Sequence, residues 1–267
     1  MHDKYTLNQI KDYWTKQAQK HEMSYAASWS DKMAIHLEIR EISNYLETND
    51  YVLDIGCANG YSTIQYALKK DITIIGVDFV SEMIESAKSA LGGHENKLIN
   101  RVKFAVGNVL DLNYEPETFD KVIATRLLIN LGDWQQQLKG IKACVNVLKK
   151  DGILLLSEGT IQGWKKLNSL RTEWGLEALP MNPFNQYIDQ NKLIESISSY
   201  MELIDIINFS STYYIGTRVL RPLLAKALDM NIDYTNHNME INRLFSLLPA
   251  YGDYGTEKLF VLRKVNL

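Results

Sequence analysis

The hydrophobic positions of residues 7–48 recur with the period of an α-helix. Ile35, Ile39, Ile42 and Leu46 are spaced so that they fall on one helix face. A short polar run, ETND, then breaks the pattern just before the first strongly apolar segment. We therefore predict that the chain begins with helices and changes to a strand at that point.

Residues 51–158 alternate between short apolar runs and amphipathic stretches. The apolar runs predict five strands, at YVLDI, ITIIGVD, RVKFAV, FDKVIAT and ILLLSE. Helix patterns begin at Tyr61, at Ser81 and after Asp133, and the last of these is capped by Asp133 and is expected to end at Gly152. Continuous apolar strands between amphipathic helices indicate a parallel sheet covered on both faces. The predicted fold class is α/β, with a doubly wound, mostly parallel sheet.

Residues 159–267 have a different pattern. YMELIDIINFSS predicts a strand, a long insertion runs from Tyr213 to about Gly255, and EKLFVLRKV closes the chain as a last strand. This last run alternates less regularly than a solvent-facing strand, so we expect it to insert into the sheet. The predicted organisation is a helical lid over 1–50, a sheet core over 51–158, and cap insertions with the last strands over the remaining residues.

Composition and charge narrow the partners and the compartment. The 267 residues carry a formal net charge of −3, which provides no global basic field for nucleic acid. Cys57 and Cys144 are the two cysteines, and they suggest reduced thiols rather than a disulfide framework. The first residues lack the apolar region of a signal peptide, and no apolar run approaches the length of a bilayer span. We therefore expect a cytoplasmic protein that binds neither nucleic acid nor membranes.

A glycine-containing turn follows the first strand of the sheet. Gly56, Ala58 and Gly60 occupy alternate positions directly after YVLDI. A bare backbone lets a ligand approach closely, and the N-terminal amides of the next helix face a carboxylate or phosphate. The dinucleotide fingerprint requires a third glycine at a spacing that this turn lacks. This difference weakens the case for an NAD-dependent oxidoreductase of the same architecture, which nevertheless stays an alternative.

The turn resembles the first motif of class I S-adenosylmethionine (SAM)-dependent methyltransferases, D/E-x-G-x-G-x-G. Asp54, Gly56, Ala58 and Gly60 match this motif, with alanine in place of the middle glycine. The extra methyl group is tolerated if Ala58 keeps a negative φ. Cys57 has no basic partner nearby in sequence and is expected to fill space rather than to react. The resemblance implies a seven-stranded Rossmann-like methyltransferase fold with SAM as the cofactor.

Further pieces of the family pattern follow in order. Asp78 comes about twenty residues after the glycines, where an acidic side chain accepts hydrogen bonds from two ribose hydroxyls. GNVLDL resembles the adenine-side motif, with Asn108 in place of the usual acid, and Arg126 and Leu127 follow the fourth strand. The resemblance covers roughly residues 35–158, and the last strand loosely. The cofactor-binding residues that it implies are Asp54, Gly56, Cys57, Ala58, Gly60, Asp78, Phe79, Met83, Asn108, Val109, Arg126 and Leu127, with Tyr13 and Tyr25 in an aromatic lid.

The acceptor site has to be predicted from the remaining residues. Methyl transfer from a sulfonium needs positioning and exclusion of water, with a base only for a neutral alcohol. Arginine forks suit phosphate or carboxylate, so the arginines of the third part suggest an anionic acceptor. The predicted catalytic residues are Arg126, Tyr187 and His237. The predicted substrate-binding residues are Glu158, which is equally placed to be a capping group, and Arg171, Tyr213, Tyr214, Arg218, Arg221 and Arg243.

The insertion before the last strand also resembles small-molecule methyltransferases that act on sugar, nucleotide or phosphorylated metabolites, some of them in bacterial surface-polysaccharide (capsule) biosynthesis. The resulting prediction is O-methylation of a small polar metabolite, anionic and phosphorylated or phosphoramidate-like. No His or Cys cluster suggests a metal, and a homodimer is possible. A non-catalytic SAM-binding protein, whose cap would lack a usable pocket, is the third alternative.

Overall fold

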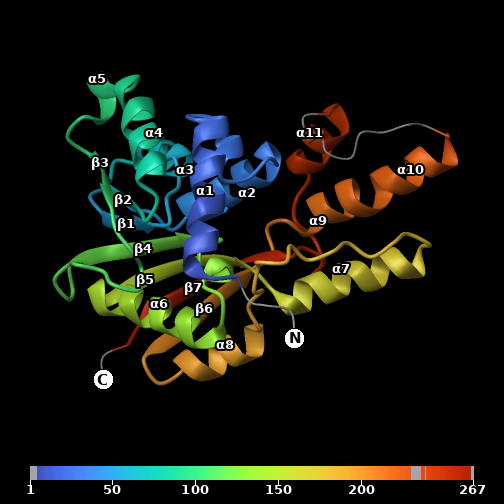
Figure 1. Cartoon of the computed structure of the whole chain (residues 1–267). Helices are drawn as coiled ribbons and strands as arrows, with labels where there is room; N and C mark the ends of the chain where they lie inside the picture. Colours follow the sequence, from blue (N-terminus) through green and yellow to red (C-terminus); the bar gives the residue numbers. More distant parts are fainter. Residues whose placement is uncertain (1–4, 230–235, 238, 266–267) are drawn as a thin grey trace.

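A seven-stranded sheet runs through the centre of the protein (Figure 1). The computed structural model describes residues 5–229, 236–237 and 239–265. The strand order is β3-β2-β1-β4-β5-β7-β6. The strands are β1 (Tyr51–Ile55), β2 (Thr73–Asp78), β3 (Val102–Val106), β4 (Phe119–Thr125), β5 (Leu148–Gly159), β6 (Met201–Ile207) and β7 (Glu257–Lys264).

The sheet is parallel from β3 to β5 and antiparallel around β7. The closing run of the chain inserts between β5 and β6, as its irregular alternation predicts. The predicted α/β class and the mostly parallel seven-stranded sheet are therefore confirmed. Because the order reverses between β1 and β4, the ends of these two strands open a crevice, the usual ligand site of such sheets.

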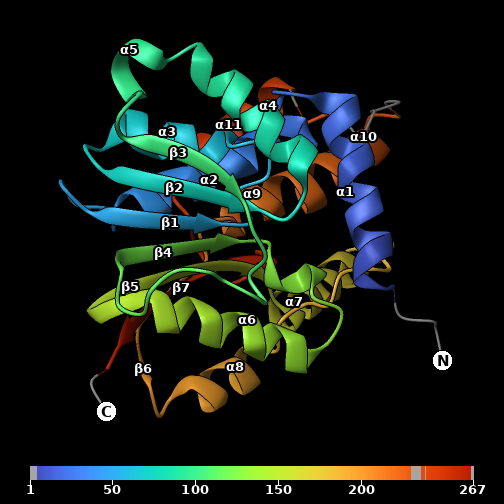
Figure 2. The same cartoon turned by 60° about the vertical axis from the view of Figure 1, so that its left-hand side comes forward.

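Helices cover both faces of the sheet, with α2, α3 and α4 on one side and α6 and α8 on the other (Figure 2). The alternation along β1 shows why. Val52 is buried against the first group and Leu53 against the second, as the two-residue period of a strand requires. The sheet helices are α2 (Lys32–Ser43), α3 (Tyr61–Lys69), α4 (Ser81–Gly92), α5 (Glu95–Leu98), α6 (Trp134–Val147) and α8 (Gln190–Ile197).

The sixth helix ends earlier than its sequence pattern predicts. The side chain of Asp133 caps it by accepting from the backbone N–H of Gln136, at 3.0 Å, as expected. However, α6 stops at Val147, and the segment expected to complete it begins β5 instead. Leu148 is fully buried and pairs with Phe119 of β4. Strand pairing at a buried position overrides the helical pattern of the preceding turns.

An α-helix and the 3-10 turn after it lie over the open end of the crevice. Helix α1 (Leu7–His21) begins with a capping box between Thr6 and Gln9, and a 3-10 turn, η1 (Tyr25–Ala27), follows it. The side-chain amide of Asn59, in the glycine turn, donates to the backbone carbonyls of Glu22 and Ser24 at 2.8 and 2.7 Å. Of the predicted lid segment, α1 and η1 therefore cover the crevice, whereas α2 packs in the sheet core.

The remaining helices form a cap at one end of the sheet (Figure 1). They are α7 (Ile161–Glu173), α9 (Ser211–Tyr214), a π-helical segment η3 (Ile215–Leu220), α10 (Arg221–Ala227) and α11 (Glu240–Leu247), while the 3-10 turn η2 (Leu128–Asn130) follows β4. Part of the predicted insertion, residues 230–235, lies outside the described residues. Of the helices in the described ranges, none is both long and apolar enough to cross a bilayer.

Gly60 tests the steric demand of the turn after β1. Its φ is +73°, and an added Cβ would lie 2.5 Å from Cζ of Phe104. Gly60→Ala is therefore expected to lower the free energy of unfolding by about 2–5 kcal/mol, measured by urea denaturation. Gly92→Ala is the matched control, because its Cβ would meet nothing within 4 Å. Equal losses in the two variants would contradict the steric explanation.

Candidate active site

Three adjoining cavities occupy the crevice at the carboxyl ends of the parallel strands. The first cavity, of about 410 Å³, is lined from the ends of β1, β2 and β3, from the loops after β1 to β4, and from the first turns of α1. The middle cavity, of about 70 Å³, shares Gly56, Asp78, Phe79, Leu127 and Asn130 with the first. The outer cavity, of about 340 Å³, shares Trp14, Ser28, Arg126 and Asn130 with the middle one. The three cavities therefore form one continuous path from the sheet to the space between α1 and residues 182–187.

The glycine turn lays bare the backbone at the start of this path. Gly56 has φ +78° and lines both the first and the middle cavity, and an added Cβ would lie 3.0 Å from Cδ1 of Leu127. Ala58 has φ +47°, so the expected negative φ is wrong. The backbone N–H of Ala58 donates to Oδ2 of Asp78 at 2.9 Å, and this bond helps hold the left-handed conformation. The cost of such a conformation for alanine is about 1–2 kcal/mol.

Asp78 lies at the end of β2 and lines both the first and the middle cavity. Its two carboxylate oxygens accept from the backbone N–H groups of Ala58 and Val80, each at 2.9 Å. The backbone N–H of Phe79 also acts on this carboxylate, which has about four acceptor positions in all and so keeps room for an incoming hydroxyl. Burial raises the pKa of Asp78 to about 6, against the opposing effect of these backbone donors.

Most of the predicted cofactor residues line this path. Gly56, Ala58, Asp78, Phe79, Met83, Asn108, Val109, Arg126 and Leu127 line the first or the middle cavity, and Tyr13 lines the outer one. Asn108 does so with its side-chain carbonyl already occupied, because Oδ1 accepts from the backbone N–H of Leu110 at 2.9 Å. Its expected bond to an adenine amino group would have to replace or share this contact.

Four predicted cofactor residues do not line the cavities. Asp54 is buried beneath the turn and accepts from Oγ1 of Thr63 at 2.5 Å, and burial raises its pKa to about 7. Cys57 is buried, and its thiol faces the backbone carbonyl of Ala58. Gly60 is packed against the ring of Phe104. The ring of Tyr25 packs edge-on against Tyr61. Asp54, Cys57 and Gly60 therefore shape the turn from behind.

Arg126 stands where the middle and outer cavities meet, and its charge is already matched. Its guanidinium donates to the buried carboxylate of Glu38, which also accepts from Oγ of Ser157 at 2.6 Å. The guanidinium carbon lies 4.7 Å from the ring centre of Trp29. Neither Glu38 nor Trp29 was among the residues predicted from the sequence. A signal existed for Glu38, which lies three residues after Ile35 on the apolar face of α2.

Glu158 caps the loop after β4 rather than facing an acceptor. Its carboxylate accepts from the backbone N–H groups of Leu127, Leu128 and Ile129 at 2.9, 2.7 and 3.3 Å. The side chain is fully buried, and burial raises its pKa to about 8. The predicted substrate contact is therefore wrong, and the capping role falls on the loop after β4 rather than on the segment that follows Glu158. Glu158 fixes the loop that brings Arg126 and Leu127 to the cavities.

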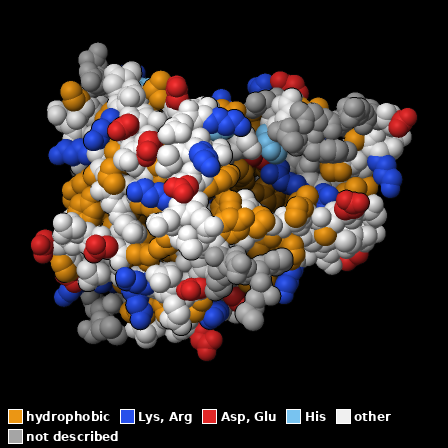
Figure 3. All heavy atoms as spheres, viewed as in Figure 1, with side chains coloured by type: hydrophobic (Ala, Val, Ile, Leu, Met, Phe, Trp, Pro, Cys, Tyr) orange, Lys and Arg blue, Asp and Glu red, His pale blue; other side chains and the backbone are white. Residues whose placement is uncertain are grey.

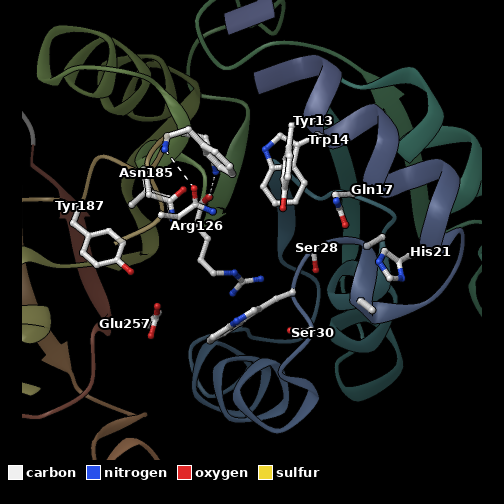
Figure 4. Close-up of a pocket in the computed structure, with 17 residues that line it drawn as sticks. Tyr13, Trp14, Gln17, His21, Ser28, Ser30, Arg126, Asn185, Tyr187 and Glu257 are labelled. Carbon is white, nitrogen blue, oxygen red and sulfur yellow. Dashed lines mark hydrogen bonds between the residues drawn. The ribbon is translucent and has the colours of Figure 1, made fainter. Parts of the chain in front are cut away.

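The outer cavity is mostly polar and aromatic. Its lining residues are Tyr13, Trp14, Gln17, His21, Ala26, Ala27, Ser28, Trp29, Ser30, Arg126, Ile129, Asn130, Asn182, Phe184, Asn185, Tyr187 and Glu257. Figure 4 shows Tyr187 and Glu257 together at one end, with Tyr13, Trp14 and His21 across from them on α1. Figure 3 shows the surface hollowed beside α1. Of the predicted catalytic residues, Arg126 and Tyr187 line this cavity. Glu257, at the start of β7, was missed.

The predicted acceptor residues of the cap lie outside the outer cavity and hold the cap together. Asp31 accepts from Nη2 of Arg218 and from the hydroxyl of Tyr213, each at 2.7 Å, and His237 lies 3.5 Å from the same carboxylate. These contacts join the cap to the N-terminal segment just before α2. The proximity of Arg218 and the hydrogen bond from Tyr213 lower the pKa of Asp31, although burial opposes them.

The other three predicted arginines and Tyr214 also have structural partners. Arg171 donates through Nε to the carbonyl of Glu177 at 2.9 Å, and Arg221 donates to Oδ1 of Asn242 at 2.6 Å. Arg243 is exposed on α11, and the hydroxyl of Tyr214 donates to Glu257. The predictions that these residues, Tyr213 and Arg218 bind the acceptor, and that His237 acts in catalysis, are therefore not supported by their positions. Most arginines of the cap form hydrogen bonds within the protein, and the spacing of residues in the sequence does not reveal these partners.

The described residues contain no group of three or more His, Cys, Asp or Glu side chains arranged to hold a metal ion. The polar groups around the three cavities include carboxylates, amides, hydroxyls, the guanidinium of Arg126, the ammonium group of Lys11 and the imidazole of His21.

Comparisons with known proteins place this fold and turn in a family. The model of a methyltransferase domain matches residues 46–210, more than half of the chain. The chain therefore belongs to the methyltransferase-domain family. The recognition of a class I SAM-dependent methyltransferase is confirmed, and SAM is the cofactor of this family.

Individual relatives agree with this assignment. The carboxy-S-adenosyl-L-methionine synthase of Nautilia profundicola is 30% identical over 140 residues, which cover 52% of this chain and 57% of that protein. The O-methyltransferase rstn1 of Aspergillus nomiae is 31% identical over 104 residues, 38% of this chain and 45% of that protein. The chain thus spans about half the length of these curated relatives.

A solved structure shares the fold over nearly the whole chain. Phosphoethanolamine N-methyltransferase 1 of Haemonchus contortus, in complex with phosphoethanolamine and S-adenosylhomocysteine (SAH), superposes with a TM-score of 0.64. The match covers 98% of this chain and 50% of that one, at 16% identity. Similarity at this level of identity shows the fold alone.

The raised pKa of Asp78 predicts a pH-dependent affinity for the cofactor product. An ionised carboxylate accepts ribose hydroxyls, so SAH affinity should be constant above about pH 7. As the pH falls through about 6, Asp78 takes up a proton, and the affinity should fall, approaching tenfold per pH unit. Isothermal titration with SAH between pH 8 and pH 5 measures this change. Asp78→Asn should bind weakly throughout, and a similar decline in that variant would assign the effect to another group.

Proposed function

We propose that this protein transfers the methyl group of SAM to a small polar acceptor bound in the outer cavity. The observation that carries this proposal is the continuous path of three cavities, which narrows at Arg126 and Asn130 between the cofactor side and the acceptor side. Such an arrangement holds two reactants in line and excludes water from the point where they meet. When bound, SAM supplies an already activated methyl group.

The chain's own residues would hold the cofactor in the first and middle cavities. Asp78 would accept the ribose hydroxyls, and the bare backbone at Gly56 would let the methionine part approach. Phe79 and Met83 offer apolar surface to the adenosine side, since both line the middle cavity. Trp14 on α1 would close the site from above. These roles match the residues that the family resemblance implies.

The charge of the acceptor needs revision. The anionic, phosphorylated metabolite was predicted from the arginines of the cap, and Arg171, Arg218, Arg221 and Arg243 do not line the outer cavity. Arg126 does line it, but its charge is matched by Glu38. The polar lining still supports a small polar acceptor, and O-methylation by positioning stays our proposal. Relatives whose names specify O- and N-methyl transfer do not separate these two outcomes.

The alternatives are less well supported. An NAD-dependent oxidoreductase is disfavoured by the match to the methyltransferase domain. A non-catalytic SAM-binding protein was expected to lack a usable pocket in its cap region, and the outer cavity argues against it. A cytoplasmic location, a homodimer and a role in surface-polysaccharide assembly stay predictions.

Titration with SAH and, in parallel, with NAD tests the cofactor assignment directly. We expect SAH to bind and NAD not to bind. Asp78→Ala should weaken SAH binding by about 1.5–3 kcal/mol, the range for a hydrogen bond to a charged group. Thermal unfolding of the variant checks that the fold is intact. Binding of NAD alone, or unchanged SAH affinity in Asp78→Ala, would contradict the proposal.

A further inference from the structure

The outer cavity contains one carboxylate, Glu257, that forms no direct ion pair with a described side chain, although the charge of Arg126 lies close enough to interact with it. The charged groups in its lining, apart from the titratable ring of His21, are Arg126 and Glu257. Glu38 forms an ion pair with Arg126 from behind the cavity wall. Glu257 forms no ion pair with any described residue, and its side chain is largely buried. A buried carboxylate without an ion-pair partner is costly unless hydrogen bonds or a bound cation stabilise it.

Glu257 is held so that one of its oxygens stays open to the cavity. As the first residue of β7 it pairs with Gly159 of β5, which fixes its backbone. Oε2 accepts from the hydroxyl of Tyr214 and from Oγ1 of Thr256, the latter at 2.6 Å. Among the described residues, none donates a hydrogen bond to Oε1. The carboxylate is therefore fixed through one oxygen and presents the other as a free acceptor.

The walls around this carboxylate suit a cation. Five aromatic residues line the same cavity: Tyr13, Trp14, Trp29, Phe184 and Tyr187. The faces of aromatic rings attract cationic nitrogen groups, and they do so more strongly where water is excluded. Figure 4 shows the ring of Tyr187 beside Glu257, with its hydroxyl pointing into the cavity. An aromatic enclosure with a carboxylate at one end is the typical arrangement for an ammonium group.

We propose that Glu257 binds a cationic nitrogen group of the methyl acceptor, so that the acceptor is a small amine-bearing molecule rather than an anion. This inference rests on the proposed methyl-transfer function and specifies the substrate class of the same cavity. Oε1 of Glu257 accepts hydrogen bonds from the ammonium group, and the aromatic walls enclose its carbon frame. The positive charge of the acceptor thereby replaces the missing partner of the carboxylate.

Three probes that differ only in their terminal group test the charge preference. Tyramine is a cation at neutral pH, 2-(4-hydroxyphenyl)ethanol is neutral, and 4-hydroxyphenylacetate is an anion. Each is titrated into protein saturated with SAH. We expect tyramine to bind about tenfold to a hundredfold more tightly than the neutral alcohol, as one charge-assisted hydrogen bond provides, and the anion to bind most weakly. Equal affinities, preference for the anion, or no tyramine binding would overturn the proposal.

Glu257→Gln tests whether this carboxylate is the cause. The amide keeps the size and an oxygen for Tyr214 and Thr256, but it loses the charge. We expect the tyramine preference to disappear while the affinity for the neutral alcohol is unchanged. Glu257→Asp, which keeps the charge, should retain part of the preference. If the tyramine preference survives in Glu257→Gln, Glu257 does not bind the cationic group and the assignment is overturned. The same result is expected if Glu257 acts only as a base.

A control variant separates this result from other causes. Glu202→Gln removes an exposed carboxylate on β6, outside the cavity, and it should keep the preference. SAH titration of every variant comes first. If the wild-type protein does not bind SAH, the proposed methyl transfer itself is contradicted. Intact SAH binding without a charge preference would contradict only the role of Glu257.

Discussion

The buried ion pair between Glu38 and Arg126 connects the sheet, the cavities and the N-terminal helices. Glu38 comes from α2, Arg126 from the loop after β4, and Ser157 from the end of β5 donates to the same carboxylate. A buried carboxylate without partners would be strongly destabilising, so the three elements have to meet at this point. The pair also sets Arg126 at the junction of the middle and outer cavities while cancelling its charge. The acceptor side is therefore shaped by an arginine that is not available to bind an anion.

The parallel half of the fold and much of the lining of the crevice could be predicted because both follow local rules. Apolar runs become buried strands, and residues at strand ends, such as Asp78 and Leu127, reach the crevice whatever the details of packing. Ala58 shows the limit of this reasoning, because its left-handed φ depends on a hydrogen bond to Asp78 twenty residues away. The predicted end of α6 was wrong for a similar reason, because pairing with β4 determines the conformation of Leu148.

The lining of the outer cavity could not be predicted because its residues meet only in three dimensions. Arg218 is paired with Asp31, which is 187 positions away in the chain. Glu257 was unremarked in sequence because its neighbours at the start of a strand gave no sign that one oxygen would face a cavity. Residue type suggested an anion-binding cap, whereas the contacts show that most of its arginines are used internally. The charged residues that line the outer cavity favour a cationic acceptor instead of an anionic one.

The two hydrogen bonds from Asn59 to the carbonyls of Glu22 and Ser24 have a consequence for motion. Asn59 lies between Ala58 and Gly60, so the glycine turn after β1 and the segment that ends α1 are fastened to one another. A ligand that fixes the turn therefore also restrains the lid, and a lid that opens loosens the turn by the same free energy. Local opening of residues 22–24, seen as amide hydrogen exchange, is thereby tied to occupancy of a cavity that those residues do not line.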